Sequence, residues 1–483
     1  MGFNELKARW VNEKAWIYRR RLPKLDVPTG AAAALVFDGL DTFATVRLDG
    51  QVILESTNMF LGHRLDITEA VKSGAERQHM LEIEFDCAQL KARDLRSKDP
   101  QHKWEGFNGD MARLAVRKAQ YHWGWDWGPV IMTAGIWREV RVEMYSARIA
   151  DLWPQTQLAA DYRTATVTAV AHIDTVSSRA YTAFFRLTLR GQEIDRQDIP
   201  VDGSNTSTAT FQVTQPQLWW PNGYGAQTLY EVSVSLVSDR NEIHHQVSKE
   251  FGIRSAEVVQ EADKHGKSFY FRINGVDIFC GGSCWIPADG LLSNISAERY
   301  WKWVRLMAEG GQKMVRYVSL RLGVFAATIL TFNGDRVWGG GVYEDDAFYK
   351  ACDQLGVLVW QDFMFGCGNY PAWPELRASI QQEAVFNVRR LRHHPSVVIY
   401  VGNNEDYQVQ EQAGLTYNYE DKDPESWLKS DFPARYIYEK LLPEVVAEMS
   451  PGTFYHPGSP WGDGKVTADP TVGDIHQWNG LLP

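Results

Sequence analysis

Two amides and a carboxylate follow one short apolar segment of the sequence. Residues 396–405 read Ser-Val-Val-Ile-Tyr-Val-Gly-Asn-Asn-Glu, and Pro395 precedes them. A continuous apolar run of this length is typical of a strand buried on both faces of a parallel sheet. In (β/α) barrels the catalytic groups lie just beyond the carboxyl ends of such strands, where Asn404 and Glu405 are expected here. The alternative is that Glu405 is an ordinary solvated acid at a strand end.

Other polar and aromatic residues follow further expected strands. The set comprises Trp338 with glycines 339–341, Asp362, Asn404 with Glu405, His456, and His476 with Trp478. Indoles among such residues, without a metal-ligand triad or a phosphate loop, point to carbohydrate chemistry. Hydrolysis of a glycosidic bond needs a carboxylic acid that protonates the leaving oxygen and a second carboxylate opposite it. Glu405 suits the acid, and Asn404 suits a contact with a sugar hydroxyl.

A second candidate site lies far upstream, in residues 122–129, His-Trp-Gly-Trp-Asp-Trp-Gly-Pro. The acid in this segment, Asp126, stands between Trp125 and Trp127. A carboxylate accepts two hydroxyl hydrogen bonds, and an indole face packs against the C–H groups of a sugar ring. We therefore expect this loop to bind a sugar. An aromatic loop that only covers the edge of a β-sandwich is the alternative.

The elements that must position Glu405 lie in residues 256–483, where strand and helix patterns alternate. Expected strands are 357–362, 396–401 and 453–456, with a last segment at 472–478, and expected helices are 297–307, 345–355, 374–393 and 432–449. This alternation predicts a parallel sheet, and its length favours a barrel over a doubly wound sheet. No G-x-G-x-x-G motif follows an expected strand, so a dinucleotide-binding fold lacks its main support.

Residues 1–145 and 146–255 favour antiparallel β-structure in two separate parts. In the first part strands are expected at 32–37, 44–48 and 80–85, with a hairpin turn at Asp49-Gly50. In the second part the pattern alternates at 164–173, 183–189 and 229–236, which predicts an immunoglobulin-like sandwich.

Composition excludes several classes of protein. The net charge of −10, with no concentrated basic face, argues against a nucleic-acid partner. The five cysteines are scattered and lack C-x-x-C spacing, which disfavours a disulfide framework or a zinc site. We expect no metal, no cofactor and no membrane partner. The N-terminal residues do not resemble a secretory signal, so a cytoplasmic location is expected.

Six motifs carry a resemblance to a known family. They are Trp-Gly-Trp-Asp-Trp-Gly-Pro at 123–129, Leu-Trp-Trp-Pro-Asn-Gly at 218–223, Phe-Gly-Ile-Arg at 251–254, Arg-Val-Trp-Gly-Gly-Gly-Val-Tyr-Glu at 336–344, Trp-Gln-Asp-Phe-Met-Phe at 360–365 and Gly-Asn-Asn-Glu at 402–405. Together they resemble glycoside hydrolase family 2, and within it the β-mannosidases of fungi. The resemblance covers nearly the whole chain, and the first, fourth and fifth motifs are specific to the mannosidase branch.

The resemblance implies a fold, an activity and a set of site residues. It implies a jelly-roll domain at 1–145, an immunoglobulin-like β-sandwich at 146–255 and an incomplete (β/α)₈ TIM barrel at 256–483. It implies a cofactor-free, retaining, exo-acting β-mannosidase that releases terminal β-mannose from oligosaccharides. Glu405 resembles the general acid/base, and Asn404 resembles the neighbour that binds the sugar 2-hydroxyl. The other matching substrate-binding residues are Trp125, Asp126, Trp338, His476 and Trp478.

Three features depart from the family pattern. The nucleophile of the family is a Glu after the seventh barrel strand, and the chain ends at Pro483, before such a position and before strands seven and eight. Residues 317–335 interrupt what the family has as one strand. The chain also begins inside the region where relatives already have an N-terminal stretch. A gene model with splicing errors explains all three, and a natural insertion or a deliberate truncation are the alternatives.

These departures bear on activity, because a retaining glycosidase needs both of its carboxylates, about 5–5.5 Å apart. We therefore expect the printed chain to have little or no mannosidase activity. Two alternatives stay open for the function. One is another β-glycosidase of the same family, namely a galactosidase, glucuronidase or exo-glucosaminidase. The other is a mannose-binding protein without catalysis. The sequence does not indicate the oligomeric state.

Overall fold

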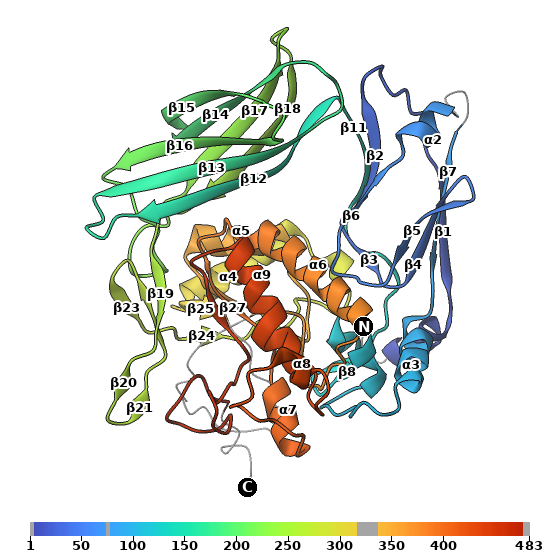
Figure 1. Cartoon of the computed structure of the whole chain (residues 1–483), viewed down its shortest axis with the longest axis vertical. Coiled ribbons are helices and arrows are strands. Elements are labelled where there is room, and N and C mark those ends of the chain that lie inside the picture. Colours follow the sequence, from blue (N-terminus) through green and yellow to red (C-terminus); the bar gives the residue numbers. More distant parts are fainter. Residues whose placement is uncertain (1–3, 74–77, 316–336, 477–483) are drawn as a thin grey trace.

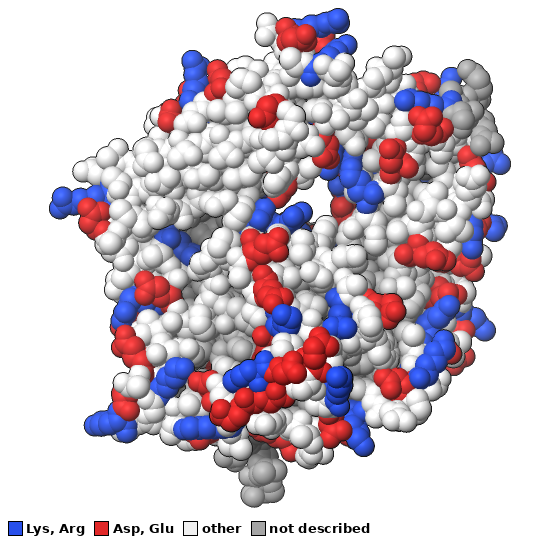
Figure 2. All heavy atoms as spheres, in the orientation of Figure 1, with Lys and Arg blue, Asp and Glu red and all other residues white. Residues whose placement is uncertain are grey.

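The computed structural model describes residues 4–73, 78–315 and 337–476 (Figure 1). A β-rich unit drawn in green lies above a unit of strands and helices drawn in yellow to red, and a second β-rich unit, drawn in blue, lies along the right side of both (Figure 1). On the face shown in Figure 2, basic and acidic side chains are intermixed. None of the helices among the described residues is long and apolar enough to cross a membrane.

The first β-rich unit is built from short antiparallel strands. Its strands are β1 (Trp16–Arg21), β2 (Ala32–Phe37), β3 (Leu40–Asp41), β4 (Ala44–Leu48), β5 (Gln51–Ser56), β6 (His63–Asp66), β7 (Met80–Phe85), β8 (Trp123–Trp125), β9 (Gly128–Val130), β10 (Gly135–Ile136) and β11 (Val140–Tyr145). They form sheets in the orders β1-β7-β4-β5 and β11-β2-β6, with the pairs β10-β3 and β8-β9. Helices α1 (Asn4–Ala8), α2 (Thr68–Ser73) and α3 (Ala88–Lys98) flank them.

The strands and the hairpin expected in this unit are confirmed. Strands β4 and β7 bury alternate residues, among them Val46 and Ile83, because successive side chains of a strand point to opposite faces. Asp49 and Gly50 connect β4 to β5 with φ angles of 53° and 85°. The tight hairpin turn that an Asp-Gly pair favours requires a positive φ angle at both central residues.

The second β-rich unit consists of two antiparallel sheets. Its strands are β12 (Ala147–Leu158), β13 (Thr164–Thr175), β14 (Tyr181–Leu189), β15 (Gln192–Pro200), β16 (Thr206–Thr214), β17 (Tyr230–Ser238) and β18 (Ile243–Phe251). The sheet orders are β12-β13-β16 and β15-β14-β17-β18. Apolar side chains from both sheets, such as Val167, Phe185 and Val234, are buried together between them. The three expected strands of this part correspond to β13, β14 and β17.

A short antiparallel region leads into the third unit. Strands β19 (Ala256–Val259), β22 (Tyr270–Ile273) and β23 (Val276–Ile278) form one sheet, and β20 (Ala262–Asp263) pairs with β21 (Gly266–Lys267). The turn between β22 and β23 is Asn274-Gly275, with positive φ at both residues.

The third unit contains a parallel sheet with helices along it. Strands β24 (Gly282–Ser283), β25 (Met314–Val315), β26 (Leu358–Asp362), β27 (Val397–Val401) and β28 (Phe454–His456) pair in that order, every pair parallel. The helices are α4 (Ala297–Glu309), α5 (Asp346–Leu355), α6 (Pro374–Leu391), α7 (Asp406–Gln412), α8 (Pro424–Trp427) and α9 (Leu442–Met449). All residues of β26 and β27 are buried, as expected for strands that are covered on both faces.

Helix boundaries in this unit follow local signals. Ser296 accepts a hydrogen bond from the backbone N–H of Arg299 and begins α4, as predicted. The helix expected at 432–449 is less regular than predicted, because residues 437–441 form a π-helical turn before α9. Pro443 lies in the first turn of α9 and has no N–H to donate, which interrupts the regular ladder there.

The expected insert, 317–335, lies outside the described residues. The residues on either side of it, Val315 and Val337, occupy the same strand position in the sheet. Val315 pairs with Val359 of β26, and Val337 pairs with Gln361, two positions further along the same strand. On the other side Val315 and Val337 pair with Ser283 and Trp285. The register therefore advances by two residues from Val315 to Val337, as the expectation of one interrupted strand requires.

The last expected segment differs from its prediction. Residues 472–476 form no strand in the described part of the segment, and residues 477 and 478 are not described. Gly473 has a φ of 62°, which breaks an extended path. The side chains of Asp474 and His476 form hydrogen bonds with the ends of neighbouring strands instead.

Candidate active site

Strand β27 carries Glu405 to the carboxyl edge of the parallel sheet. After Gly402 the chain turns sharply, and Glu405 adopts a left-handed backbone conformation with a φ of 65° at the start of α7. Its backbone N–H donates to the carbonyl of Ser459 at 2.9 Å. The glycine is required, because a Cβ at position 402 would lie 2.2 Å from the carbonyl oxygen of Pro457. The turn thus fixes the direction of the Glu405 side chain.

Both carboxylate oxygens of Glu405 contact other side chains. Nδ1 of His476 lies 2.7 Å from Oε1, and the thiol of Cys367 donates to Oε2 at 3.2 Å. The Glu405 side chain is 13% exposed. A mostly buried carboxyl group with two hydrogen-bonding partners is held in one orientation, as a proton-transfer group requires.

His476 belongs to a chain of hydrogen-bonded side chains. Its Nε2 lies 3.2 Å from Oγ of Ser459, and Ser459 in turn donates to Asp474. The other oxygen of Asp474 lies 2.8 Å from Nε2 of His456, at the end of β28. The structure therefore brings His456 and His476, both singled out from the sequence, to the region of Glu405, where they contact protein groups.

The sulfur of Cys367 connects Asn404 with Glu405. The side-chain amide of Asn404 donates to this sulfur at 3.1 Å, and the thiol donates to Glu405. Burial raises the pKa of the Cys367 thiol well above its usual range, so the thiol keeps the proton that it donates. The sequence interpretation missed this contact, because it treated Cys367 only as one of five scattered cysteines. The available signal was its position two residues after the Trp-Gln-Asp-Phe-Met-Phe motif.

The expected sugar-binding loop is a small hairpin made by β8 and β9. Asp126 and Trp127 form its turn, and Asp126 is exposed. The ring centroids of Trp125 and Trp127 lie 4.7 and 5.4 Å from that of Trp338, which belongs to the third unit. The structure therefore joins two motifs that lie more than two hundred residues apart in the sequence.

Trp338 itself is almost fully buried, with 1% exposure. The next residue, Gly339, donates its backbone N–H to Asp362 at 3.1 Å, and Trp360 donates its indole N–H to the same carboxylate. Asp362, another strand-end residue from the sequence, thus fixes the glycine loop beside Trp338. The role of Trp338 as a wall of a sugar subsite stays a prediction, and Trp478 lies outside the described residues.

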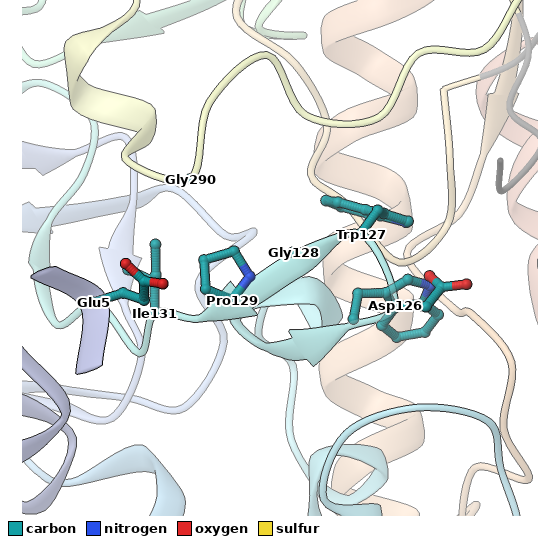
Figure 3. A pocket seen from close by; sticks show the side chains of 8 residues that line it. Glu5, Asp126, Trp127, Gly128, Pro129, Ile131 and Gly290 are labelled. Atoms are coloured by element: carbon teal, nitrogen blue, oxygen red, sulfur yellow. The ribbon is translucent and has the colours of Figure 1, made fainter. Parts of the chain in front are cut away.

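A pocket of about 570 Å³ opens beside the hairpin (Figure 3). Its lining residues are Glu5, Trp125, Asp126, Trp127, Gly128, Pro129, Ile131 and Gly290. In Figure 3, Trp127 and Asp126 lie at one end and Glu5 and Ile131 at the other. Glu405 is not one of the described residues that line this pocket. The pocket therefore adjoins the hairpin and not the carboxylate of Glu405.

No group of three or more metal-ligating side chains converges within residues 4–73, 78–315 and 337–476. The expectation that the protein uses no metal and no cofactor stays a prediction.

Comparison with family models assigns the two β-rich regions. Residues 1–138 match the glycosyl hydrolase 2 galactose-binding domain-like family, and residues 147–254 match glycosyl hydrolases family 2. The chain belongs to glycosyl hydrolase family 2. The resemblance inferred from the six sequence motifs is therefore confirmed.

Curated relatives resemble the chain over almost all of its residues. Beta-mannosidase B of Aspergillus fumigatus is 66% identical over 479 residues, which cover 99% of this chain and 54% of the relative. Beta-mannosidase B of Emericella nidulans is 64% identical over 480 residues, with the same coverage. The chain thus spans about half the length of the curated relatives that it matches.

Two solved structures also resemble the chain over most of its residues. The beta-D-mannosidase of Dictyoglomus thermophilum superimposes with a TM-score of 0.83 at 32% identity, over 99% of this chain and 55% of that one. The exo-chitosanase of Amycolatopsis orientalis superimposes with a TM-score of 0.64 at 18% identity, over 92% of this chain and 45% of that one. At that identity the second likeness concerns the fold alone.

Proposed function

We propose that the function of the chain is that of an exo-acting, retaining β-mannosidase, which hydrolyses terminal non-reducing β-D-mannose residues of oligosaccharides. One observation carries the proposal. In a chain 66% identical to Beta-mannosidase B, the Glu405 carboxyl group is oriented by His476 and Cys367 at the carboxyl edge of a parallel sheet. This is the location of catalytic groups in (β/α) barrels.

The finer architecture belongs to the same proposal. Residues 1–145 are taken as a jelly-roll domain, 146–255 as an immunoglobulin-like sandwich and 256–483 as part of a (β/α)₈ barrel. The parallel order β24-β25-β26-β27-β28, with helices between successive strands, supports the barrel. The cytoplasmic location inferred from the sequence is part of the proposal as well.

Glu405 acts first as a general acid and then as a general base. It gives its proton to the oxygen of the leaving sugar while a second, nucleophilic carboxylate forms a bond to the anomeric carbon. It later removes a proton from the water that displaces this carboxylate. Asn404 binds the 2-hydroxyl of the mannose, while Trp125 and Asp126 supply an indole face and a hydroxyl acceptor from the first domain. His476 keeps the Glu405 carboxyl group in the orientation that these transfers need.

A binding experiment tests the substrate class. We expect the printed chain to bind a hydrolysis-resistant, sulfur-linked aryl β-mannoside in a calorimetric titration, and to bind the matching galactoside, glucuronide and glucosaminide more weakly. Asp126→Ala removes a hydroxyl acceptor and should weaken mannoside binding by about tenfold, the value of a hydrogen bond to a charged group. Equal binding of all four sugars would contradict the mannosidase assignment.

A turnover experiment tests the catalytic role of Glu405. The printed chain and Beta-mannosidase B of Aspergillus fumigatus are compared on aryl β-mannosides at the same molar concentration. Any turnover by the printed chain should fall by about a hundredfold or more in Glu405→Gln, the typical contribution of general acid–base catalysis. Turnover by the printed chain at the rate of the fungal enzyme would overturn the expectation of low activity. Mannoside binding without turnover would favour a mannose-binding role.

A further inference from the structure

Arg113 is a fully buried arginine that joins the first β-rich unit to the turn beside Glu405. It lies in a 3₁₀ turn at Met111–Ala115. One of its terminal nitrogens, Nη1, donates to the carbonyl of Gly366 at 2.9 Å, and the other, Nη2, donates to the carbonyl of Cys367 at 2.8 Å. Its remaining acceptors are the carbonyls of Phe107 and Asn108, the side-chain oxygen of Gln120 and the hydroxyl of Tyr370.

Among the described residues, the acceptors of Arg113 are all uncharged oxygens. A guanidinium group stays protonated in proteins, and a buried charge is costly unless hydrogen bonds compensate it. The charge of Arg113 is therefore stabilised by carbonyl dipoles that must point at it. Two of those dipoles belong to Gly366 and Cys367, so the position of this turn depends directly on the guanidinium group.

The same guanidinium also faces the hairpin of the first unit. Its central carbon lies 5.1 Å from the centroid of the Trp125 ring, within the range of a cation–π contact. Arg113 thus touches Trp125 of the hairpin that the proposed function assigns to the sugar site, and the turn whose Cys367 contacts Glu405.

The turn at Gly366–Gly368 transmits this position to Glu405. The backbone N–H of Cys367 donates to the carbonyl of Asn404 at 2.7 Å, and the thiol donates to Glu405 at 3.2 Å. The backbone N–H of Gly368 donates to Asp406 at 2.9 Å. Three consecutive residues after β27, 404–406, are therefore bound to a turn that Arg113 holds from the other side.

We propose that Arg113 is a positioning residue for Glu405, which acts through the Gly366–Cys367 carbonyls and the Cys367 thiol. The catalytic importance of Glu405 rests on the proposed function, whereas the positioning can be measured without a substrate. Arg113 couples the docking of the first domain to the orientation of the acid. It does not contact the reacting atoms.

Infrared spectroscopy of the printed chain tests the proposal, because the S–H stretching band lies where proteins absorb little else and shifts with hydrogen bonding. The difference between the parent and Cys367→Ala assigns the band of this thiol. Glu405→Gln should move the band towards that of a weaker hydrogen bond. Arg113→Met should move it in the same direction, and Arg113→Lys, which keeps the charge and one donor group, should give a smaller shift.

Arg254→Met is the matched control. Arg254 is a partly buried arginine that also donates to backbone carbonyls, those of Pro395 and Val397, and it joins the second β-rich unit to the opposite end of β27. We expect the Cys367 band to stay unchanged in this variant. An unchanged band in Arg113→Met, or an equal shift in Arg254→Met, would overturn the proposal.

Thiol labelling gives a second readout that separates local release from unfolding. Cys352, buried in α5, serves as the internal reference for Cys367. In Arg113→Lys or Arg113→Met the alkylation rate of Cys367 relative to Cys352 should rise by about tenfold, the factor expected when hydrogen bonds to a charged group are lost. A constant ratio in both variants would overturn the proposal. If β-mannosides do not bind while the band and the ratio change as expected, the proposed function fails and the positioning role stands.

Discussion

Nδ1 of His476 lies 2.7 Å from Oε1 of Glu405, although the two residues are 71 positions apart in the sequence. Since Cys367 contacts the other carboxylate oxygen, the two partners together restrict rotation of the carboxyl group. The imidazole is itself held through Ser459. The orientation of the candidate acid therefore depends on a side chain near the end of the described structure.

Loss of the imidazole should weaken ligand binding at this carboxylate. We expect His476→Ala to lower the affinity for the sulfur-linked β-mannoside by about tenfold, because a hydrogen bond to a charged group contributes about 1.5 kcal/mol or more. His476→Asn keeps a donor near the Nδ1 position and should retain most of the affinity. Ser459→Ala removes only the contact to the far ring nitrogen, so its effect should be smaller. Calorimetric titration measures all three, and equal affinities of His476→Ala and the parent would contradict this role.

The location of the candidate acid was predictable from local sequence. The short apolar run between Pro395 and Gly402 predicted a buried parallel strand, so the residues after it, including Glu405, were expected at the carboxyl end of that strand. Helices with clear N-caps, such as those after Ser296 and Asp345, were also predictable. These features depend on residues close together in the chain.

The partners of Glu405 were not predictable in the same way. Arg113 contacts the carbonyl of Gly366 across 253 positions, and nothing in its neighbourhood distinguishes it from a surface arginine. Cys367 offered only its position two residues after the Trp-Gln-Asp-Phe-Met-Phe motif as a signal, because its role comes from the turn after β26. His476 was predicted to bind substrate, which stays a prediction, but its contacts with Glu405 and Ser459 were not predicted. Contacts of this kind arise only when segments that are far apart in the sequence pack together.

The carboxyl group next to the candidate acid should make stability depend on pH. Burial raises the pKa of Asp406 to about 7, and its oxygens accept hydrogen bonds from Gly368 and Tyr438. Below about pH 4 both the folded and the unfolded chain carry this proton. Between about pH 4 and 7 the unfolded chain releases it while the folded chain keeps it, so the free energy of unfolding falls as pH rises. Asp406 thus costs the folded state about 4 kcal/mol above about pH 7, from a shift of about 3 pKa units.

Asp406→Asn should remove this dependence, because asparagine resembles the protonated acid and can keep both contacts. Urea unfolding of the parent and the variant at about pH 4 and pH 8 measures this dependence. The free energy of unfolding of the variant relative to that of the parent should grow by up to about 4 kcal/mol between the two pH values. A difference in the free energy of unfolding between variant and parent that is the same at both pH values would show that Asp406 is ionised in the folded protein.

A buried ion pair should contribute strongly to the attachment of the first domain. Arg117 donates to both carboxylate oxygens of Glu383 on α6, at 2.8 and 2.7 Å, and both side chains are buried. Arg117→Met leaves the Glu383 charge with Asn58 and Tyr343 as its donors among the described residues, and should lower the free energy of unfolding by about 3–5 kcal/mol. Urea unfolding measures this loss.

The paired variant is the control for that measurement. Arg117→Met combined with Glu383→Met removes both charges and should recover much of the loss, since apolar residues of similar volume often replace a buried pair at little cost. If the double variant is less stable than Arg117→Met alone, the cost comes from packing and not from the uncompensated charge.

A single methyl group at Gly402 should disrupt the site without removing a functional group. The Cβ of Gly402→Ala would lie 2.2 Å from the carbonyl oxygen of Pro457 and 2.7 Å from the hydroxyl of Tyr455, so the backbone after β28 must move. Overpacking of this kind typically costs about 1–3 kcal/mol, and the shift should reach Glu405 through its hydrogen bond to Ser459. We expect a lower thermal midpoint and a loss of β-mannoside binding. Gly203→Ala, where a Cβ meets no atom within 4 Å, should leave both unchanged. A Gly402→Ala variant that binds and melts like the parent would mean that the turn before Glu405 tolerates a side chain, and that the acid is not fixed by it.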